Sequence, residues 1–246
     1  MDDHAVAARL ATEAGRLLLG IREEFLDADA SERKSLGDKR SHEFLLEALT
    51  NLRPGDAVLS EEGADDPARL RSERVWIVDP LDGTREFSEL GRDDWAVHVA
   101  LWRVGELVAG AVALPAQGVT LATPSVGAPP AMPGTPRIVV SRTRSPAIAL
   151  AVRDALDGVL VEMGSAGAKV ASIVQGLADV YVHAGGQFEW DSAAPVAVAR
   201  AAGLHASRID GSALAYNQPD PKLPDVLVCR PELAQAVLAV TAPSAE

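Results

Sequence analysis

A proline-rich segment divides this sequence into two parts that differ in their hydrophobic pattern. Residues 124–136 contain five prolines, and proline is excluded from helix interiors and from central strands. Before this segment, two long apolar runs, residues 95–102 and 107–114, flank a short glycine-containing turn and predict an antiparallel hairpin. After it, short apolar runs alternate with helical patterns, as in α/β proteins. We therefore predict an N-terminal α+β subdomain, residues 1–136, and a C-terminal α/β subdomain, residues 137–246.

The N-terminal part is predicted to begin with two helices followed by a buried strand. Residues 3–25 place apolar side chains at helical spacing and predict an amphipathic helix. Residues 27–39 are polar, lack either periodicity, and predict a surface loop long enough to act as a lid. A second helix is expected over about residues 41–52. The β-branched and aromatic run at residues 75–78 is typical of a buried strand.

Composition restricts the class of protein and its partners. Of the 246 residues, 48% are apolar, and the net charge of −12 disfavours nucleic-acid polymers and anionic membranes as partners. The single cysteine, Cys229, excludes an internal disulfide framework and fits a reducing compartment. No run approaches the roughly 20 apolar residues that span a bilayer, and the acidic residues after Met1 are unlike a signal peptide. We therefore expect a cytoplasmic protein.

The most informative segment is residues 79–84, DPLDGT, which we call the acidic motif. It follows the predicted buried strand directly. Pro80 stiffens the turn and Gly83 permits an unusual backbone angle, so the carboxylates of Asp79 and Asp82 can converge with the Thr84 hydroxyl. Clustered oxygens of this kind are what hard cations require. An ordinary turn after a strand uses the same residue types, so the motif alone leaves both interpretations open.

Together with two other segments, the acidic motif resembles the signature of the inositol monophosphatase and fructose bisphosphatase superfamily of metal-dependent phosphatases. Upstream, residues 60–63, SEEG, match the acidic pair of that family. Downstream, residues 190–194, WDSAA, match its second signature. Residues 84–87, TREF, are similar to the branch of bacterial 3'(2'),5'-bisphosphate nucleotidases of the CysQ type, whereas inositol phosphatases more often carry Asn before the Phe. The resemblance implies a layered αβαβα sugar-phosphatase fold.

The resemblance also implies a metal site with two or three Mg²⁺ ions. Such ions lie about 4 Å apart, where one activates water and another stabilises the leaving oxygen. Histidine and cysteine are absent from the three motifs, which argues against zinc. The implied ligands are the carboxylates of Glu61, Asp79, Asp82 and Asp191 and the Leu81 carbonyl.

Three residues receive catalytic roles from the resemblance. Thr84 would orient the attacking water, Asp38 would help to accept its proton, and Glu61 would act with the metal. A helix cap after Gly37 is an alternative role for Asp38. Glu62 is expected either to take part directly or to be a solvated neighbour of Glu61.

Phosphate contacts are expected at the start of a helix in the second part. Residues 164–167 precede a predicted helix whose backbone amides and dipole favour an anion near Ser165 and Ala166. An ordinary serine cap is the alternative. Lys169, in the first turn of that helix, resembles the lysine of the nucleotidase branch and would bind a second phosphate. Gly83, Thr84 and Asp191 are also expected to contact substrate.

Two further residues are candidates for substrate contact. Arg142 resembles an arginine of the nucleotidase branch, with an exposed strand-end arginine as the alternative. His183 lies near the position where inositol phosphatases carry a glutamate and nucleotidases an arginine. Pro195 departs from the family pattern and is expected in the first turn of a helix, where proline is tolerated. The remaining histidines are expected to be structural or solvated: His4, His42, His98 and His205.

The function implied by the resemblance is hydrolysis of 3'-phosphoadenosine 5'-phosphate to AMP and phosphate, in sulfur assimilation or nucleotide recycling. The sulfated form of this nucleotide is a second candidate substrate. Water would attack in line without a phosphoenzyme, and the family suggests a lithium-sensitive homodimer. The alternatives are inositol monophosphatase or fructose 1,6-bisphosphatase activity on the same metal centre, and a non-catalytic sensor of nucleotide or metal.

Overall fold

The computed structural model describes residues 1–132, 134–143 and 145–242. It contains two five-stranded sheets. The strands of the first sheet are β1 (Ala57–Ser60), β2 (Arg74–Asp82), β3 (Ala96–Arg103), β4 (Glu106–Leu114) and β5 (Val119–Ala122). Those of the second are β6 (Arg137–Ser141), β7 (Val159–Met163), β8 (Val180–Phe188), β9 (His205–Ser207) and β10 (Lys222–Cys229).

The two sheets differ in strand direction. The first has the order β1-β2-β3-β4-β5, and only its β1–β2 pair is parallel. The predicted hairpin is confirmed as β3 and β4, which are joined at Val104 and Gly105, both with positive φ. The second has the order β7-β6-β8-β10-β9, in which β6 runs parallel to both β7 and β8. The predicted change from antiparallel to α/β pairing is therefore confirmed.

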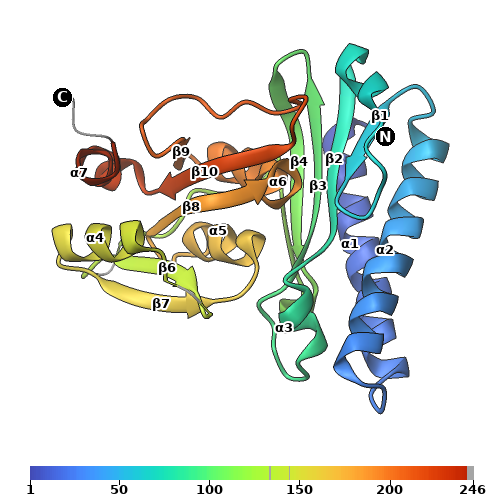
Figure 1. Cartoon of the computed structure of the whole chain (residues 1–246), viewed down its shortest axis with the longest axis horizontal. Helices are drawn as coiled ribbons and strands as arrows, with labels where there is room; N and C mark the ends of the chain where they lie inside the picture. Colours follow the sequence, from blue (N-terminus) through green and yellow to red (C-terminus); the bar gives the residue numbers. More distant parts are fainter. Residues whose placement is uncertain (133, 144, 243–246) are drawn as a thin grey trace.

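Helices and sheets alternate in five layers, as Figure 1 shows. Helices α1 (Asp3–Glu24) and α2 (Ala30–Leu52) cover one face of the first sheet, α5 (Ala166–Val174) and α6 (Glu189–Ala201) lie between the sheets, and α4 (Ala147–Ala155) and α7 (Pro231–Thr241) cover the outer face of the second. An apolar cluster fills each of the three spaces in which helices meet a sheet. The predicted layered αβαβα fold is confirmed. The short helices are α3 (Thr84–Ser88), η1 (Pro67–Arg71) and η2 (Pro115–Gln117).

The predicted polar loop over residues 27–39 is wrong, because α2 already begins at Ala30. Asp29 caps this helix by accepting from the Glu32 amide. Arg33, which is 5% exposed, donates to the carbonyls of Phe25 and Ala28 and so ties the first turn to the end of α1. These contacts stabilise a polar helix that has little apolar periodicity of its own. Consequently there is no flexible lid of this length here.

Within the described ranges, no helix is long and apolar enough to cross a membrane.

Candidate active site

The carboxyl end of β2 carries the acidic motif into the interior. Asp79 and Asp82 are 1% and 8% exposed. Asp79 Oδ1 accepts a hydrogen bond from the Leu81 amide (3.0 Å), and Ser41 Oγ of α2 donates to the Pro80 carbonyl (2.7 Å). The turn that carries both carboxylates and the Leu81 carbonyl is therefore fixed by its own side chain and by a neighbouring helix.

Gly83 lets this turn approach the second half of the chain. Its φ of +83° lies in the left-handed region, which favours glycine. A Cβ at this position would lie 3.0 Å from Ser165 Cβ. Thr84 follows as the first residue of α3, so the predicted hydroxyl lies beside the acidic turn.

Asp82 is the carboxylate with the most hydrogen-bond partners at the site. Its Oδ2 accepts from Ser165 Oγ (2.5 Å) and from the Gly167 amide (2.7 Å), and it lies 3.2 Å from His98 Nε2. Burial opposes ionisation, but His98 and the two hydrogen bonds outweigh it and lower the pKa of Asp82 to about 2. Asp82 is therefore ionised at neutral pH.

The other carboxylates repel one another. Burial, followed by the charges of Asp82, Glu61 and Asp191, raises the pKa of Asp79 well above its usual range. Desolvation and the charge of Asp191 raise the pKa of Glu61 to about 7, and burial and Asp82 raise that of Asp191 to about 6. In the described part of the chain, the buried Asp79 Oδ2 has no hydrogen-bond partner. One carboxylate oxygen each of Asp79 and Asp82 and one ring nitrogen of His98 lie within 4.8 Å of one another, so this under-neutralised group could hold a divalent cation.

The predicted ligands outside the acidic motif come from two other elements. Ser60 ends β1 opposite Val78 of the parallel strand β2, so Glu61 leaves the sheet at the same edge as Asp79. Asp191 is the third residue of α6, and its Oδ2 accepts from the Phe188 amide (2.6 Å). The charges of Glu61, Asp79, Asp82 and Asp191 affect one another's pKa values, which fits the prediction that these carboxylates form one site.

The predicted start of α6 needs a correction. The helix begins at Glu189, because the Glu189 amide donates to the Pro221 carbonyl and Asp191 binds the amide of Phe188. Pro195 is therefore in the second turn and not in the first. Proline there lacks the amide that would bind the carbonyl of Asp191, so this helix tolerates one missing bond next to a predicted ligand.

Asp38 lies in the interior of α2, so its alternative role as a helix cap is wrong. It lines a cleft of about 340 Å³ together with Lys34 and Glu62. Burial and the charge of Glu62, partly offset by Lys34, raise the pKa of Asp38 to about 6. The neighbouring Gly37 packs against Phe87 of α3, the helix that Thr84 begins. Gly37 therefore faces α3, whereas Asp38 faces the cleft that it shares with Glu62.

Helix α5 begins at the site, but two of its nearby amides already bind carboxylates. Ser165 is the N-cap, and its Oγ accepts from the Ala168 amide (2.9 Å) while it also donates to Asp82. The Gly164 amide donates to Asp94 Oδ2 (2.5 Å) and the Gly167 amide to Asp82. Ser165 therefore caps the helix, and the start of α5 also binds anions. In this structure the bound anions are the carboxylates of Asp82 and Asp94. Ala166 begins the helix and is 7% exposed.

Lys169 points inward in this structure. The side chain is 6% exposed, and its Nζ donates to the carbonyls of Ser165 (2.8 Å) and Gly164 (3.1 Å). The ammonium also lies 5.5 Å from the centre of the Tyr181 ring. Lys169 therefore stabilises the loop before α5 through the backbone carbonyls of that loop.

Arg142 and His183 lie at the carboxyl edge of the second sheet. Arg142 Nη2 pairs with Glu86 (2.7 Å) and Glu89 (3.1 Å), which come from the N-terminal half, and its partly exposed side chain lies directly after the end of β6. His183 lines a cleft of about 660 Å³ with Ser141 and other residues of this edge. Burial and the nearby charge of Lys169 lower the pKa of His183.

Sequence reasoning missed three buried residues that contact the site. Glu86 and Asp94 are 6% and 4% exposed, and they bind Arg142 and the Gly164 amide respectively. His98 is fully buried beside Asp82, although it was expected to be structural or solvated. The alternating pattern of β3 predicts that the His98 side chain is buried. It does not predict which side chain His98 contacts, so the sequence carried no direct signal for the contact with Asp82.

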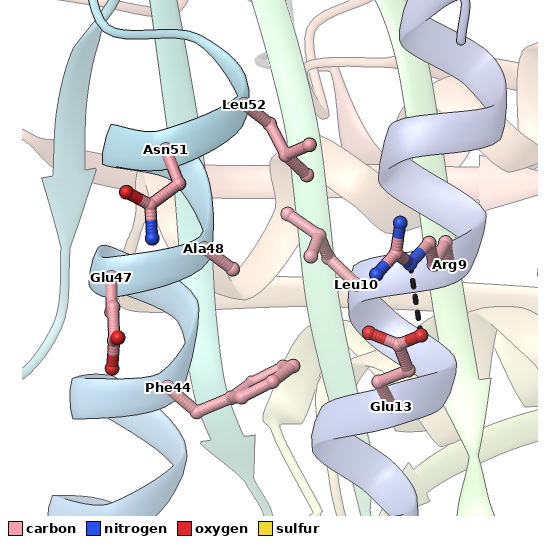
Figure 2. Close-up of a pocket in the computed structure, with 8 residues that line it drawn as sticks. All are labelled: Arg9, Leu10, Glu13, Phe44, Glu47, Ala48, Asn51 and Leu52. Carbon is pink, nitrogen blue, oxygen red and sulfur yellow. Dashed lines mark hydrogen bonds and ion pairs between the residues drawn. The ribbon is translucent and has the colours of Figure 1, made fainter.

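A separate groove of about 410 Å³ lies between α1 and α2, with Leu10, Phe44 and Leu52 in its wall (Figure 2). An Arg9–Glu13 ion pair borders it. None of the predicted site residues is among those that line this groove, so it is distinct from the acidic site.

Comparison with protein families identifies this arrangement. The model of the inositol monophosphatase family matches residues 2–244. The chain belongs to the inositol monophosphatase family. A member from Mycobacterium tuberculosis, the 3'-phosphoadenosine 5'-phosphate phosphatase, is 54% identical over 239 residues, which cover 94% of this chain and 90% of that protein. The 3'(2'),5'-bisphosphate nucleotidase CysQ of Salmonella typhimurium is 30% identical over 85% of this chain and 91% of its own length.

Solved structures agree with the family fold. Inositol monophosphatase II of Staphylococcus aureus has a TM-score of 0.81 and 21% identity, with 95% of this chain and 93% of that chain covered. At this level of identity the likeness concerns the fold alone. The family prediction from the three motifs is confirmed.

Proposed function

We propose that this protein is a metal-dependent phosphatase that hydrolyses 3'-phosphoadenosine 5'-phosphate to AMP and phosphate. The observation that carries the proposal is the 54% identity to a phosphatase of that name over nearly the whole chain. The buried and closely spaced carboxylates of Asp79 and Asp82 support a metal-dependent reaction. A non-catalytic sensor is disfavoured, because the candidates for the base and for the metal ligands are present together.

Mg²⁺ is the proposed cofactor, held by Glu61, Asp79, Asp82, Asp191 and the Leu81 carbonyl. The raised pKa values of three of these carboxyl groups fit a bound positive charge, and among the described residues the buried Asp79 Oδ2 has no hydrogen-bond partner. When bound, Mg²⁺ would acidify water and stabilise charge on the leaving oxygen.

Asp38 and Thr84 are the proposed proton acceptor and water-orienting group. A general base is most effective when its pKa lies near the working pH. The pKa of Asp38, raised to about 6, leaves the carboxylate largely ionised at neutral pH yet basic enough to accept a proton. The Thr84 hydroxyl, next to the fixed acidic turn, can accept a hydrogen bond from water and donate one to Asp38. Glu61 acts in this scheme by binding the cation.

The substrate is proposed to lie between the acidic turn and the cleft at His183. Gly83, Thr84, Ser165, Ala166 and Asp191 would surround the 3'-phosphate. The cleft of about 660 Å³ falls within the range of roughly 300–1,000 Å³ that holds small ligands. Its lining includes polar groups, such as His183 and Ser141, and apolar groups, such as Ile148, which suit a nucleoside.

The second phosphate of the nucleotide is proposed to bind Arg142 and Lys169. Arg142 reaches the edge of the substrate region from β6, and its two acidic partners hold the guanidinium there. Lys169 would have to exchange its bonds to two backbone carbonyls for the phosphate, or act on it through the loop.

A phosphate-release panel tests the proposal. Purified protein with Mg²⁺ is assayed on 3'-phosphoadenosine 5'-phosphate, its sulfated form, inositol 1-phosphate and fructose 1,6-bisphosphate. We expect the highest kcat/KM on the adenosine bisphosphate. A clear preference for inositol phosphate or fructose bisphosphate would overturn the substrate assignment, and tight nucleotide binding with no phosphate release would favour a sensor. Light scattering and inhibition by LiCl test the predicted homodimer and lithium sensitivity.

A further inference from the structure

His98 connects the parts of the site that come from different elements of the fold. It lies on β3, directly opposite Asp79 of β2 in the strand register. Its imidazole is fully buried, with Nε2 3.2 Å from Asp82 Oδ2 and Nδ1 3.0 Å from the Trp190 carbonyl. Trp190 precedes Asp191 in α6. One ring therefore contacts the carboxylate at the end of β2 and the backbone that carries Asp191.

The orientation of this ring follows from its partners. A carbonyl oxygen only accepts hydrogen bonds, so Nδ1 of His98 must carry the hydrogen that binds Trp190. Nε2 then faces Asp82, and in the described part of the chain it has no other partner. Nδ1 also lies 3.9 Å from Asp79 Oδ2. The ring is thus fixed at one end and directed at the carboxylates at the other.

Helix α5 leaves room for the ring only because residue 167 is glycine. A Cβ on Gly167 would lie 2.0 Å from His98 Nε2, which no side-chain contact allows. The Gly167 amide and Ser165 Oγ bind the same Asp82 oxygen that His98 faces. The ring is therefore packed tightly among β2, α5 and α6.

We infer that His98 is a positioning residue that holds the Asp82 side and the Asp191 side of the metal site at a fixed separation. The inference rests on the proposed function, because it assumes that the acidic site binds a divalent cation. Without the cation the carboxylates repel one another, since burial and the charge of Asp82 together raise the pKa of Asp191. A rigid group that joins the two sides opposes their separation, so the ligands are already arranged when the cation arrives.

The test measures cation affinity and not turnover. Isothermal titration of the substrate-free protein with Mn²⁺ compares the wild type with His98→Asn and His98→Gln. Asn keeps a nitrogen near Nδ1 but loses the group at Asp82, whereas the Gln amide extends toward Asp82. Groups that orient metal ligands typically change affinity 10–100-fold when they are removed. We expect His98→Asn to weaken Mn²⁺ binding by about that factor and His98→Gln to recover part of the loss.

A matched control and a second variant separate positioning from general stability. His205→Asn makes the same change at a histidine on β9 that binds Ser207 Oγ, and it should leave Mn²⁺ affinity unchanged. Gly167→Ala displaces the His98 ring without removing it and should weaken Mn²⁺ binding in the same direction. Thermal melts report whether each variant folds. If His98→Asn does not fold, the Mn²⁺ affinity of Gly167→Ala tests the positioning role.

The inference is overturned if a folded His98→Asn or Gly167→Ala protein binds Mn²⁺ as tightly as the wild type, or if His205→Asn loses as much affinity. Phosphate release by the wild type is measured in parallel. A wild-type protein that binds no cation and releases no phosphate would reject the proposed function itself. A wild type that does both, beside unaffected His98 variants, would reject only the positioning role.

Discussion

The two sheets contribute to the site in different ways. The end of β2 in the first sheet presents Asp79 and Asp82 on a turn that is buried and hydrogen-bonded from several sides. The carboxyl edge of the second sheet instead borders an open cleft of about 660 Å³, with a half-buried His183. The first sheet therefore holds the carboxylates of Asp79 and Asp82 in fixed positions. The second sheet presents an open cleft at His183 that is large enough for a small ligand.

The largest effect is expected from breaking the fixed half. Asp82→Asn should lower kcat/KM at least about 10³-fold at ordinary Mg²⁺ concentration. A cation contributes several kcal/mol of charge stabilisation, and each 1.36 kcal/mol is a factor of ten in rate. Steady-state kinetics with increasing Mg²⁺ measure the change. Near-normal turnover at saturating Mg²⁺ would show that Asp82 is not a ligand.

A smaller loss of activity is expected when Asp38 is replaced. Asp38 comes from the N-terminal half and is the proposed acceptor of the proton from water. Asp38→Asn should reduce kcat about 100-fold, the low end of the effect of a general base, with little change in KM. Because the carboxylate must be ionised, wild-type kcat should fall as the pH drops below about 6, the raised pKa of Asp38. A pH profile of kcat in both proteins checks this; a variant that keeps the same acidic limb would assign that limb to another group.

The open half should affect binding of particular substrates. Arg142→Gln should raise KM for 3'-phosphoadenosine 5'-phosphate about tenfold, because a hydrogen bond to a charged group contributes roughly 1.5–3 kcal/mol. The control substrate is 3'-AMP, which lacks the second phosphate and should show little change. Equal losses on both substrates would mean that Arg142 supports the fold through Glu86 and Glu89 and does not select the second phosphate.

The smallest effect concerns stability without a cation. Glu61 and Asp191 have pKa values raised to about 7 and 6, so between pH 4 and pH 7 the folded state holds more protons than the unfolded state. The metal-free fold should therefore lose stability as the pH rises through this window. Asp179, which directly precedes β8, contributes with the opposite pH dependence, since hydrogen bonds from Arg137 and Arg230 outweigh burial and lower its pKa.

Thermal melts of EDTA-treated protein from pH 5 to pH 8 measure this difference. Mg²⁺ at about 100 times its Kd should restore roughly 2.7 kcal/mol, which is several degrees in Tm for a chain of this size. The Mg²⁺ response should shrink in Asp82→Asn. A metal-free Tm that rises steadily across the window would contradict the proposed repulsion among the carboxylates.

Much of this arrangement was predictable because it depends on short-range pattern. The order of the three motifs identified the family, and the buried strand before Asp79 predicted where the acidic motif would lie. The hairpin and the later α/β alternation followed from hydrophobic periodicity and turn residues. The hairpin, the α/β alternation and each single motif are determined by residues close together in the sequence.

The errors arose where distant residues decide local structure. Residues 30–39 form a helix because Asp29 caps its first turn and Arg33 donates to the Phe25 carbonyl and to the carbonyl of the distant Ser88. Pro195 lies deeper in α6 than expected because Pro221, thirty-two residues after Glu189, extends the helix start. Propensity is a weak guide where tertiary contacts of this kind are available.

The sequence by itself determined which carboxylates this protein has, their order, and the strand and helix ends that carry them, because backbone propensity and motif spacing are local. Only the tertiary structure brings His98 to Asp82 and, through the packing of the two halves, pairs Arg142 with Glu86. These contacts depend on how two sheets pack through α5 and α6. Packing at that distance is set by the shapes of buried side chains, which no single segment of the sequence specifies.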